Sequence, residues 1–121
     1  MSLKVLVVDD SGVMRKIIIR SLNAVGVTDV VEAGDGNEGV ARFKEAAFNI
    51  VLTDWNMPGK SGLEMVKEIR ATGSTVPIMM ITTEAEKTRV MEAIQAGVND
   101  YLAKPFEADM LRAKLDKYCA G

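Results

Sequence analysis

Two kinds of apolar spacing alternate along this chain. Runs of mostly consecutive apolar residues, typical of strands buried in a sheet, occupy residues 4–8, 30–33, 50–54, 78–82 and 100–103. After each run, apolar residues recur at helical spacing, over about 12–25, 37–47, 62–71, 85–96 and 107–118. Five strands that alternate with five helices predict βαβ units, and therefore an α/β domain built on a parallel sheet.

The predicted helices have recognisable ends and apolar faces. Ser11 is expected to cap the first helix, and Gly26 and Gly97 are expected to stop the first and fourth, because glycine accepts the backbone conformation found at helix ends. The apolar positions of the five helices are, in order, Met14, Ile17, Ile18, Leu22 and Val25; Val40, Phe43 and Ala47; Leu63, Val66 and Ile69; Val90, Met91 and Ile94; and Leu111, Leu115 and Tyr118.

Polarity predicts the order of the strands. The first, third and fourth runs are apolar almost throughout and should be central, whereas the second carries Glu32 and the fifth carries Asp100, which suits the edges of a sheet. With right-handed crossovers, the order 2-1-3-4-5 satisfies this. The direction of winding then reverses between strands 1 and 3, which is where ligands bind in such sheets.

Composition narrows the class of protein. The chain has 121 residues, a length suited to one domain with its own core, and no apolar run approaches the roughly 20 residues of a membrane span. Its first residues lead straight into a strand, so we expect no signal peptide. A net charge of −2 without a dense Lys/Arg cluster gives no reason to propose nucleic-acid binding. The single cysteine, Cys119, excludes an internal disulfide and fits a reducing cytoplasm.

Histidine is absent from the chain, which excludes several kinds of chemistry. Without it there is no Ser-His-Asp or Cys-His catalysis, and no imidazole ligand for zinc. A bound ion would therefore have oxygen ligands, which favours Mg²⁺, Ca²⁺ or Mn²⁺.

Reactive side chains stand at the ends of four apolar runs. Asp9 and Asp10 follow the first run, Asp54 ends the third, Thr82 ends the fourth and Lys104 follows the fifth. Each has an ordinary explanation by itself, because Asp is a common helix cap and turn residue, and a lysine after a strand is commonly solvated. Their joint position at the carboxyl edge of one sheet is better explained by a shared site.

Three neighbouring carboxylates repel one another, so protonation or a bound cation must relieve the repulsion. At neutral pH a hard divalent cation is the better answer, and Mg²⁺ would leave coordination positions for phosphoryl oxygens. A carboxylate such as Asp54 beside Mg²⁺ can attack phosphorus and hold an aspartyl phosphate. Lys104 and the Thr82 hydroxyl could supply the positive charge and the donor that a transferring phosphoryl group needs.

The ordered set of motifs resembles the receiver domain of two-component response regulators, and most closely its single-domain chemotaxis members. The resemblance covers the whole chain and implies a flavodoxin-like fold of five βα units, with residues 1–121 forming one receiver domain and no output domain. Its carriers are Val8-Asp9-Asp10, Asp54-Trp55-Asn56-Met57-Pro58 followed by Gly62, Thr82 with Glu84, Ala96-Gly97, and Tyr101 through Lys104-Pro105-Phe106.

The resemblance implies roles for the residues at the strand ends. Asp54 matches the phosphoacceptor, and Asp10 matches a direct Mg²⁺ ligand, with Mn²⁺ as a possible substitute. Asp9 matches a residue that assists the metal through water, and the Asn56 backbone carbonyl matches a further ligand. Lys104 matches the phosphoryl-binding lysine, and its bond to Pro105 is similar to one that is cis in the family.

Thr82 and Tyr101 resemble the family's switch pair. When the threonine turns toward the phosphoryl group, the aromatic ring fills the vacated space and reshapes the face formed by residues 85–96, 100–103 and 107–118. By itself, Tyr101 would be read as a half-buried aromatic on an edge strand.

Asn56, Thr83 and Glu84 match positions that set the lifetime of the phosphoryl group. Two residues depart from the family pattern: Thr83 stands where Ala or Gly is usual, and Ser61 stands where many members have Asp before Gly62.

The resemblance implies a signalling switch that catalyses its own phosphorylation and dephosphorylation, and not a classical enzyme. It would accept a phosphoryl group from a histidine kinase of the chemotaxis type and then bind a target, such as a flagellar motor switch or a phosphatase, as a cytoplasmic monomer. A phosphorelay shuttle that passes the group to a histidine phosphotransfer protein is an alternative. A phosphatase of the haloacid dehalogenase type is another, although Asp54-Trp55-Asn56 lacks the second carboxylate of its Asp-x-Asp motif.

Overall fold

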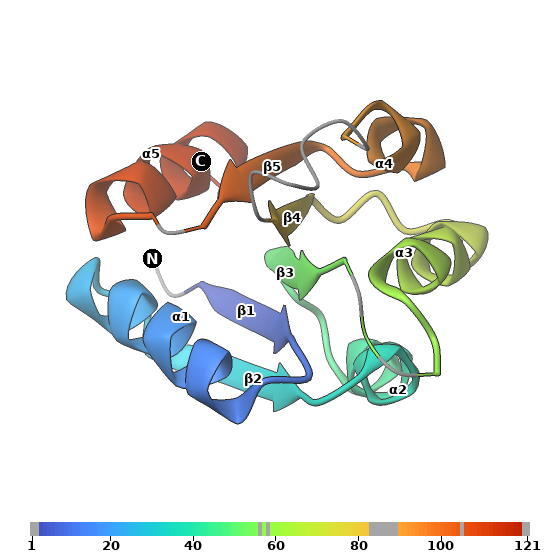
Figure 1. The fold of residues 1–121 in the computed structure, drawn as a ribbon, viewed down its shortest axis with the longest axis horizontal. Helices are drawn as coiled ribbons and strands as arrows, with labels where there is room; N and C mark the ends of the chain where they lie inside the picture. Colours follow the sequence, from blue (N-terminus) through green and yellow to red (C-terminus); the bar gives the residue numbers. More distant parts are fainter. Residues whose placement is uncertain (1–2, 56, 58, 83–89, 105, 120–121) are drawn as a thin grey trace.

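Five parallel strands form the central sheet, in the order β2-β1-β3-β4-β5 (Figure 1). The computed structural model describes residues 3–55, 57, 59–82, 90–104 and 106–119, apart from the side chains of Thr82 and Val90. The strands are β1 (Lys4–Val8), β2 (Asp29–Ala33), β3 (Ile50–Asp54), β4 (Ile78–Thr82) and β5 (Asp100–Ala103). The strand order predicted from polarity is confirmed, with Glu32 and Asp100 on the two edge strands.

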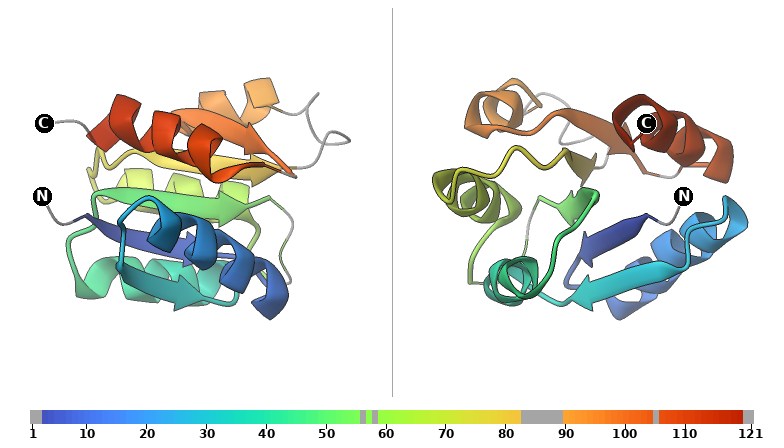
Figure 2. Two further views of the ribbon diagram at one scale, coloured as in Figure 1. Left: turned by 90° about the vertical axis from the view of Figure 1, so that its left-hand side faces the viewer. Right: turned by 180° about the vertical axis from the view of Figure 1, so that it is seen from behind.

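Five helices cover the two faces of the sheet. They are α1 (Gly12–Ala24), α2 (Gly36–Glu45), α3 (Gly62–Ala71), α4 (Val90–Ala96) and α5 (Ala108–Cys119). Helices α1 and α5 lie side by side on one face, and α2, α3 and α4 lie on the other (Figures 1 and 2). The fold is therefore a three-layer α/β/α sandwich of the flavodoxin-like type, as the resemblance implied.

The core has one layer on each side of the sheet, because successive strand residues point to opposite faces. Along β1, Leu6 and Val8 pack toward α2 and α3, whereas Val5 and Val7 pack toward α1 and α5. All four side chains are buried. Burial on both faces explains why the central strands read as continuous apolar runs.

Helix caps fix where the elements begin. The Ser11 hydroxyl accepts a hydrogen bond from the Met14 amide at the start of α1, as predicted. At the start of α3, Ser61 and Glu64 form a reciprocal capping box, and the bonds from Ser61 lower the pKa of Glu64. The departure at Ser61 therefore retains a residue type that caps a helix as well as Asp does.

Two predicted helix features are wrong. Helix α2 ends at Glu45, and Ala47 is exposed after it, whereas Phe48 turns back and stacks against Phe43. A larger side chain at the point of return buries more apolar surface than alanine could, so Phe48 takes the inward position.

In α4, Met91 is 65% exposed and Ile94 is 46% exposed, although both were assigned to its apolar face. Ala93 is buried in their place, and so is Val98 in the segment that follows the helix. The predicted first part of this helix, residues 85–89, lies outside the described residues.

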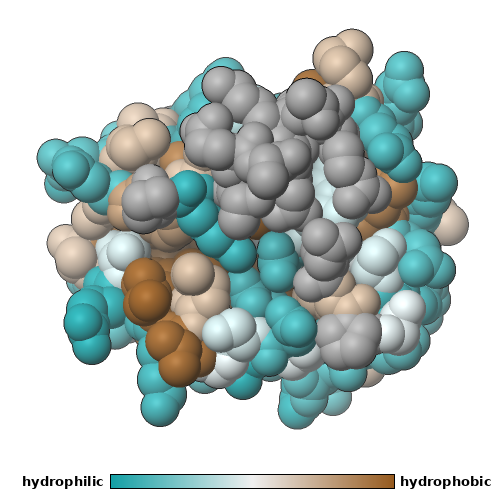
Figure 3. Space-filling model, viewed as in Figure 1, coloured by the Kyte–Doolittle hydropathy of each residue, from teal (hydrophilic) through white to brown (hydrophobic). Residues whose placement is uncertain are grey.

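Helix α1 also exposes apolar surface. Val13 is 71% exposed and Ile17 is 46% exposed, while Ile18 and Leu22 face the sheet. Apolar side chains accordingly reach the surface over this helix in Figure 3 (lower left). Within the described part of the chain, no helix combines the length and apolar character needed to cross a membrane.

Candidate functional site

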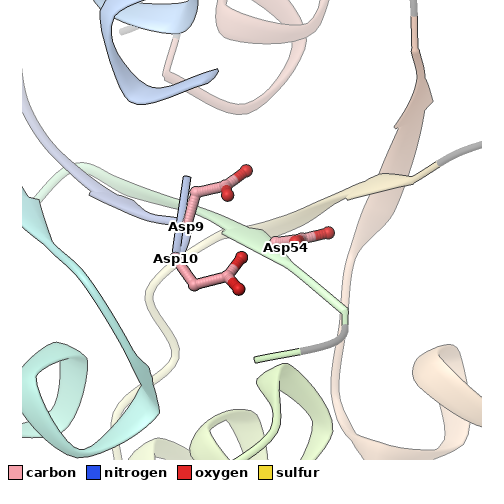
Figure 4. A group of neighbouring side chains, drawn as sticks. All are labelled: Asp9, Asp10 and Asp54. Carbon is pink, nitrogen blue, oxygen red and sulfur yellow. The ribbon is translucent and has the colours of Figure 1, made fainter. Parts of the chain in front are cut away.

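The carboxyl ends of all five strands lie along one edge of the sheet, because the strands run in the same direction (Figure 2). Val8 of β1 is in register with Thr53 of β3, so the residues that follow them, Asp9 and Asp54, arrive next to each other. Asp10 comes one residue later. Each of the three carboxylates places one oxygen within 4.8 Å of the other two (Figure 4). The acidic cluster predicted from the strand ends is therefore present.

The three carboxylates differ in exposure to solvent. Asp9 is buried at 1% exposure, Asp54 is partly buried and Asp10 is exposed. Oδ1 of Asp9 accepts a hydrogen bond of 2.8 Å from the Ser11 amide. Oδ2 is also buried and has no hydrogen-bond partner among the described residues. A buried carboxylate oxygen without a donor is costly, and coordination of a cation or of its water would satisfy it.

Asp54 is held from both its side chain and its main chain. Its Oδ1 accepts a hydrogen bond of 2.8 Å from the Trp55 amide, and its carbonyl oxygen accepts one of 3.0 Å from the Thr53 hydroxyl. Trp55 itself is buried. These contacts fix the direction of the carboxylate before any ligand arrives, which is what a nucleophile in a preorganised site requires.

Lys104 follows β5 and brings a positive charge to this edge. Its Nζ lies 3.5 Å from Oδ1 of Asp54 and 3.6 Å from Oδ2 of Asp9, with the side chain only 17% exposed. Among the described residues, three carboxylates and this one ammonium form the cluster, so negative charge exceeds positive charge there. Such a balance suits a hard divalent cation with oxygen ligands, so the residues present fit a metal of the Mg²⁺ class.

Gly62 allows α3 to begin directly against the end of β3. A Cβ atom at this position would lie 2.1 Å from the Asp54 carbonyl oxygen, which is far inside van der Waals contact. The Gly62 amide also donates to the Trp55 carbonyl at 2.9 Å. The backbone of the acidic cluster and the start of α3 therefore form one tightly packed unit, and only glycine fits at the contact.

Of the remaining predicted residues, some lie outside the described part of the chain, and Thr82 and Tyr101 lie on strands of the sheet. Asn56, Thr83, Glu84 and Pro105 lie outside the described residues. Thr82 is described only in its backbone, as the last residue of β4, where it pairs with Ala103 of β5. Tyr101 lies on β5 and is partly buried against the core on the α2–α3–α4 side. The sheet therefore brings the Thr82 backbone to the same edge as Asp54 and Lys104.

Sequence reasoning missed one residue that touches this cluster. Arg15, in the first turns of α1, donates a hydrogen bond of 2.5 Å to the carbonyl oxygen of Asp9. An arginine on a helix carries no signal of its own, because most are solvated. Its pairing with Glu32 of β2 could have indicated its direction only once the strand order was known.

Comparisons with known proteins agree with this geometry. The family model of the response regulator receiver domain matches residues 5–116. The chain is 44% identical over 118 residues to chemotaxis protein CheY-3 of Vibrio cholerae, a match that covers 96% of this chain and 91% of that protein.

Two solved structures show the same arrangement of elements. The chemotaxis protein CheY4 of Vibrio cholerae superimposes with a TM-score of 0.89 at 34% identity, covering 98% of this chain and 99% of that one. The receiver domain of the sensor histidine kinase PA1611 from Pseudomonas aeruginosa superimposes with a TM-score of 0.89 at 31% identity, with full coverage of both chains (100% each). That domain holds a magnesium ion coordinated in its active-site cleft.

Proposed function

This chain belongs to the response regulator receiver family, and from that premise we propose that it is a phosphorylation-activated switch of a chemotaxis pathway. Asp54 accepts a phosphoryl group from a histidine kinase, and the phosphorylated protein binds a target. The observation that carries this proposal is the pairing of Asp54 with Lys104 at 3.5 Å beside the carboxylates of Asp9 and Asp10.

In the proposed transfer, a carboxylate oxygen of Asp54 attacks the phosphorus of a phosphohistidine. A P–O bond forms, the P–N bond breaks, and the imidazole leaves with its electron pair and takes up a proton. The Trp55 amide holds Asp54 in place, and Lys104 lies close enough to shift from the carboxylate to an oxygen of the incoming phosphoryl group. The chain thus assists its own phosphorylation without acting as a classical enzyme.

Asp9, Asp10 and Asp54, with the backbone carbonyl of Asn56, would hold the metal, for which we propose Mg²⁺ with Mn²⁺ as a substitute. A bound divalent cation supplies positive charge to the phosphoryl oxygens during transfer. The buried Oδ2 of Asp9 and the gathering of three carboxylate oxygens within 4.8 Å of one another support this assignment. Asn56, Thr83 and Glu84 are proposed to set the rate at which the phosphoryl group is lost.

The proposed output lies on the α4–β5–α5 face and is controlled by Thr82 and Tyr101. Met91 and Ile94 on α4 and Met110 on α5 are all about half exposed or more, which supports a protein-binding surface there. Similarity to chemotaxis regulators favours a kinase of the chemotaxis type as donor, and a flagellar motor switch or a phosphatase as target. We propose that the protein works through its receiver domain in the cytoplasm and as a monomer, without nucleic-acid or membrane partners.

The test is phosphorylation by a small donor. With Mg²⁺ and acetyl phosphate, mass spectrometry should show one added phosphoryl group, which Asp54→Asn should abolish. Asp29→Asn is the matched control, because Asp29 starts β2 at the opposite end of the sheet and pairs with Lys4. Labelling of Asp54→Asn at the wild-type rate would refute the assignment.

A phosphorelay shuttle would use the same site, so the chemistry of Asp54 does not separate the two roles. Incubating the phosphorylated chain with a histidine phosphotransfer protein does, because a shuttle passes the group on rapidly. The hydrolase alternative has no support from the family match, which covers residues 5–116.

A further inference from the structure

Arg15 connects the β1–α1 loop, which carries Asp9 and Asp10, to the neighbouring edge strand β2. Its Nη1 donates to the Asp9 carbonyl at 2.5 Å, and its Nε donates to Oε1 of Glu32 on β2 at 2.9 Å. The side chain is mostly buried at 22% exposure, which is unusual for an arginine on an outer helix. Its guanidinium therefore lies between the β1–α1 loop and the β2–α2 loop and is anchored to an element on either side.

The surroundings of Arg15 are shaped to accept the guanidinium. Gly12 and Gly34 border it, and a Cβ on either residue would lie in ordinary van der Waals contact with the guanidinium, at 3.5 Å and 3.7 Å. A side chain longer than alanine at either position would compete with the guanidinium for this space. Glu32 supplies the opposite charge that makes the burial tolerable.

Asp9 is consequently held at three points. Its amide donates to the Ala33 carbonyl at 3.1 Å, its carbonyl accepts from Arg15, and its Oδ1 accepts from the Ser11 amide. With these three bonds in place, Oδ2, which accepts no hydrogen bond among the described residues and lies 3.6 Å from Nζ of Lys104, is directed into the acidic cluster. Only the bond from Arg15 comes from a side chain that is itself anchored on another strand.

We propose that Arg15, held by Glu32, is a positioning residue that sets the divalent-cation affinity of the site by fixing the Asp9–Asp10 turn. This inference rests on the proposed function, because it names what supports the metal ligands of that same site. Arg15 acts through the main chain of Asp9, and its charge has the wrong sign to attract the metal.

The direction in which the Mg²⁺ affinity changes when Arg15 is replaced distinguishes a positioning role from an electrostatic one. If the charge of Arg15 were its main influence, removing it would strengthen Mg²⁺ binding, because one repelling cation would be gone. If Arg15 positions the turn, removing it weakens binding, because the ligands lose their preorganised geometry. Outer partners of metal ligands commonly change metal affinity by about 10- to 100-fold, so the positioning effect is large enough to outweigh a screened charge.

The experiment measures the Mg²⁺ dissociation constant by fluorescence of Trp55, which is buried next to Asp54. Arg15→Met should weaken Mg²⁺ binding about tenfold, and Arg15→Lys should recover part of this because lysine can still donate to the Asp9 carbonyl. Glu32→Gln should weaken binding less. The variant with both Arg15→Met and Glu32→Gln should bind Mg²⁺ no more weakly than Arg15→Met alone, because both changes remove the same support for the Asp9–Asp10 turn.

Lys104→Met provides the electrostatic reference, because it also removes one positive charge but from a side chain in direct contact with the carboxylates. It should tighten Mg²⁺ binding. In metal-free protein, hydrogen exchange of the Ser11 amide should accelerate in Arg15→Met and not in Lys104→Met. Thermal unfolding of each variant shows whether it is folded, and if Arg15→Met does not fold, Arg15→Lys and Glu32→Gln carry the same prediction.

Unchanged or tighter Mg²⁺ binding in Arg15→Met, with wild-type exchange at Ser11, would overturn the inference. A wild-type protein that binds no Mg²⁺ in the millimolar range would instead overturn the proposed function. The two failures are therefore distinguishable in the same titration.

Discussion

Replacing Gly62 with alanine should disturb Asp54, the proposed phosphoacceptor, through the backbone alone. The new Cβ would lie 2.1 Å from the Asp54 carbonyl oxygen, whereas close carbon–oxygen contacts are about 3.3 Å. Either the end of β3 or the start of α3 must therefore move by roughly 1 Å. Because the strain falls on the residue that carries the nucleophile, stability and reactivity should both suffer.

The loss of folding stability in Gly62→Ala can be estimated from two opposing contributions. Forcing an extra methyl group into a packed contact costs about 1–3 kcal/mol, and replacing glycine in a compatible backbone conformation returns about 0.4–1 kcal/mol. The net loss should be about 1–2 kcal/mol, which lowers the Tm of a domain of this size by about 3–10 °C. A displacement of roughly 1 Å in a reacting group can slow a reaction about 100-fold, so phosphorylation should slow by at least about tenfold.

Thermal unfolding and the rate of phosphorylation by acetyl phosphate, followed through Trp55, measure the two effects. Gly73→Ala is the matched control. Gly73 has a φ of +88°, and a Cβ added there would have no other atom within 4 Å, so alanine is strained without meeting a neighbour. Gly73 lies between α3 and the start of β4, whereas Asp54 is the last residue of the parallel strand β3, so the two lie at opposite ends of the sheet.

Gly73→Ala should lose about 1 kcal/mol of stability from its left-handed backbone and keep the wild-type rate. Gly62→Ala should lose both stability and rate. The reasoning is wrong if Gly62→Ala phosphorylates as fast as Gly73→Ala, because the contact with Asp54 would then have no mechanical consequence.

Two further predictions concern charged side chains. Lys104→Arg keeps the charge but changes its reach and shape, so phosphorylation should survive while target binding fails; normal target binding in a pull-down with a beryllofluoride mimic would contradict the proposed switch. Asp100 is partly buried, which raises its pKa, but bonds from Lys114, the Tyr101 amide and Tyr118 lower the pKa by more, so the net shift is downward. Its stabilisation is therefore complete above its unfolded pKa of about 3.9 and is lost as the pH falls through the lower folded pKa. Asp100→Asn should be about 1–2 kcal/mol less stable than wild type in urea at pH 7, with the difference shrinking below about pH 4; a pH-independent difference would refute this origin.

The features that sequence predicted well share one physical basis. Strand positions and order follow from burial on both faces, which leaves an unmistakable apolar run, and from charges that only edge strands tolerate. The cluster of Asp9, Asp10 and Asp54 then follows from topology, because parallel strands end at one edge. No side-chain geometry was needed for that inference.

The features that sequence missed depend on three-dimensional packing. Met91 and Ile94 read as an inward face, yet the described part of α4 buries Ala93, since a small residue lets the helix approach its neighbours. At the end of α2 a larger residue is favoured instead: Phe48 packs inward against Phe43, and Ala47, one residue earlier, does not. The role of Arg15 could not be predicted from sequence, because it depends on a hydrogen bond to a main-chain carbonyl and every residue has such a carbonyl.

The charges on β2 have a consequence for how copies of the protein meet. An edge strand offers unpaired amides and carbonyls to which a strand of another molecule can add. Asp29 and Glu32 project from this short strand with about half of their side chains exposed, so a second copy approaching edge to edge would have to desolvate both carboxylates and the ion pairs that they form with Lys4 and Arg15. The carboxylate of Glu32 therefore has two roles: it anchors Arg15, and it opposes edge-to-edge association through β2. An apolar residue at that position would open the sheet to self-association as well as loosen the acidic turn.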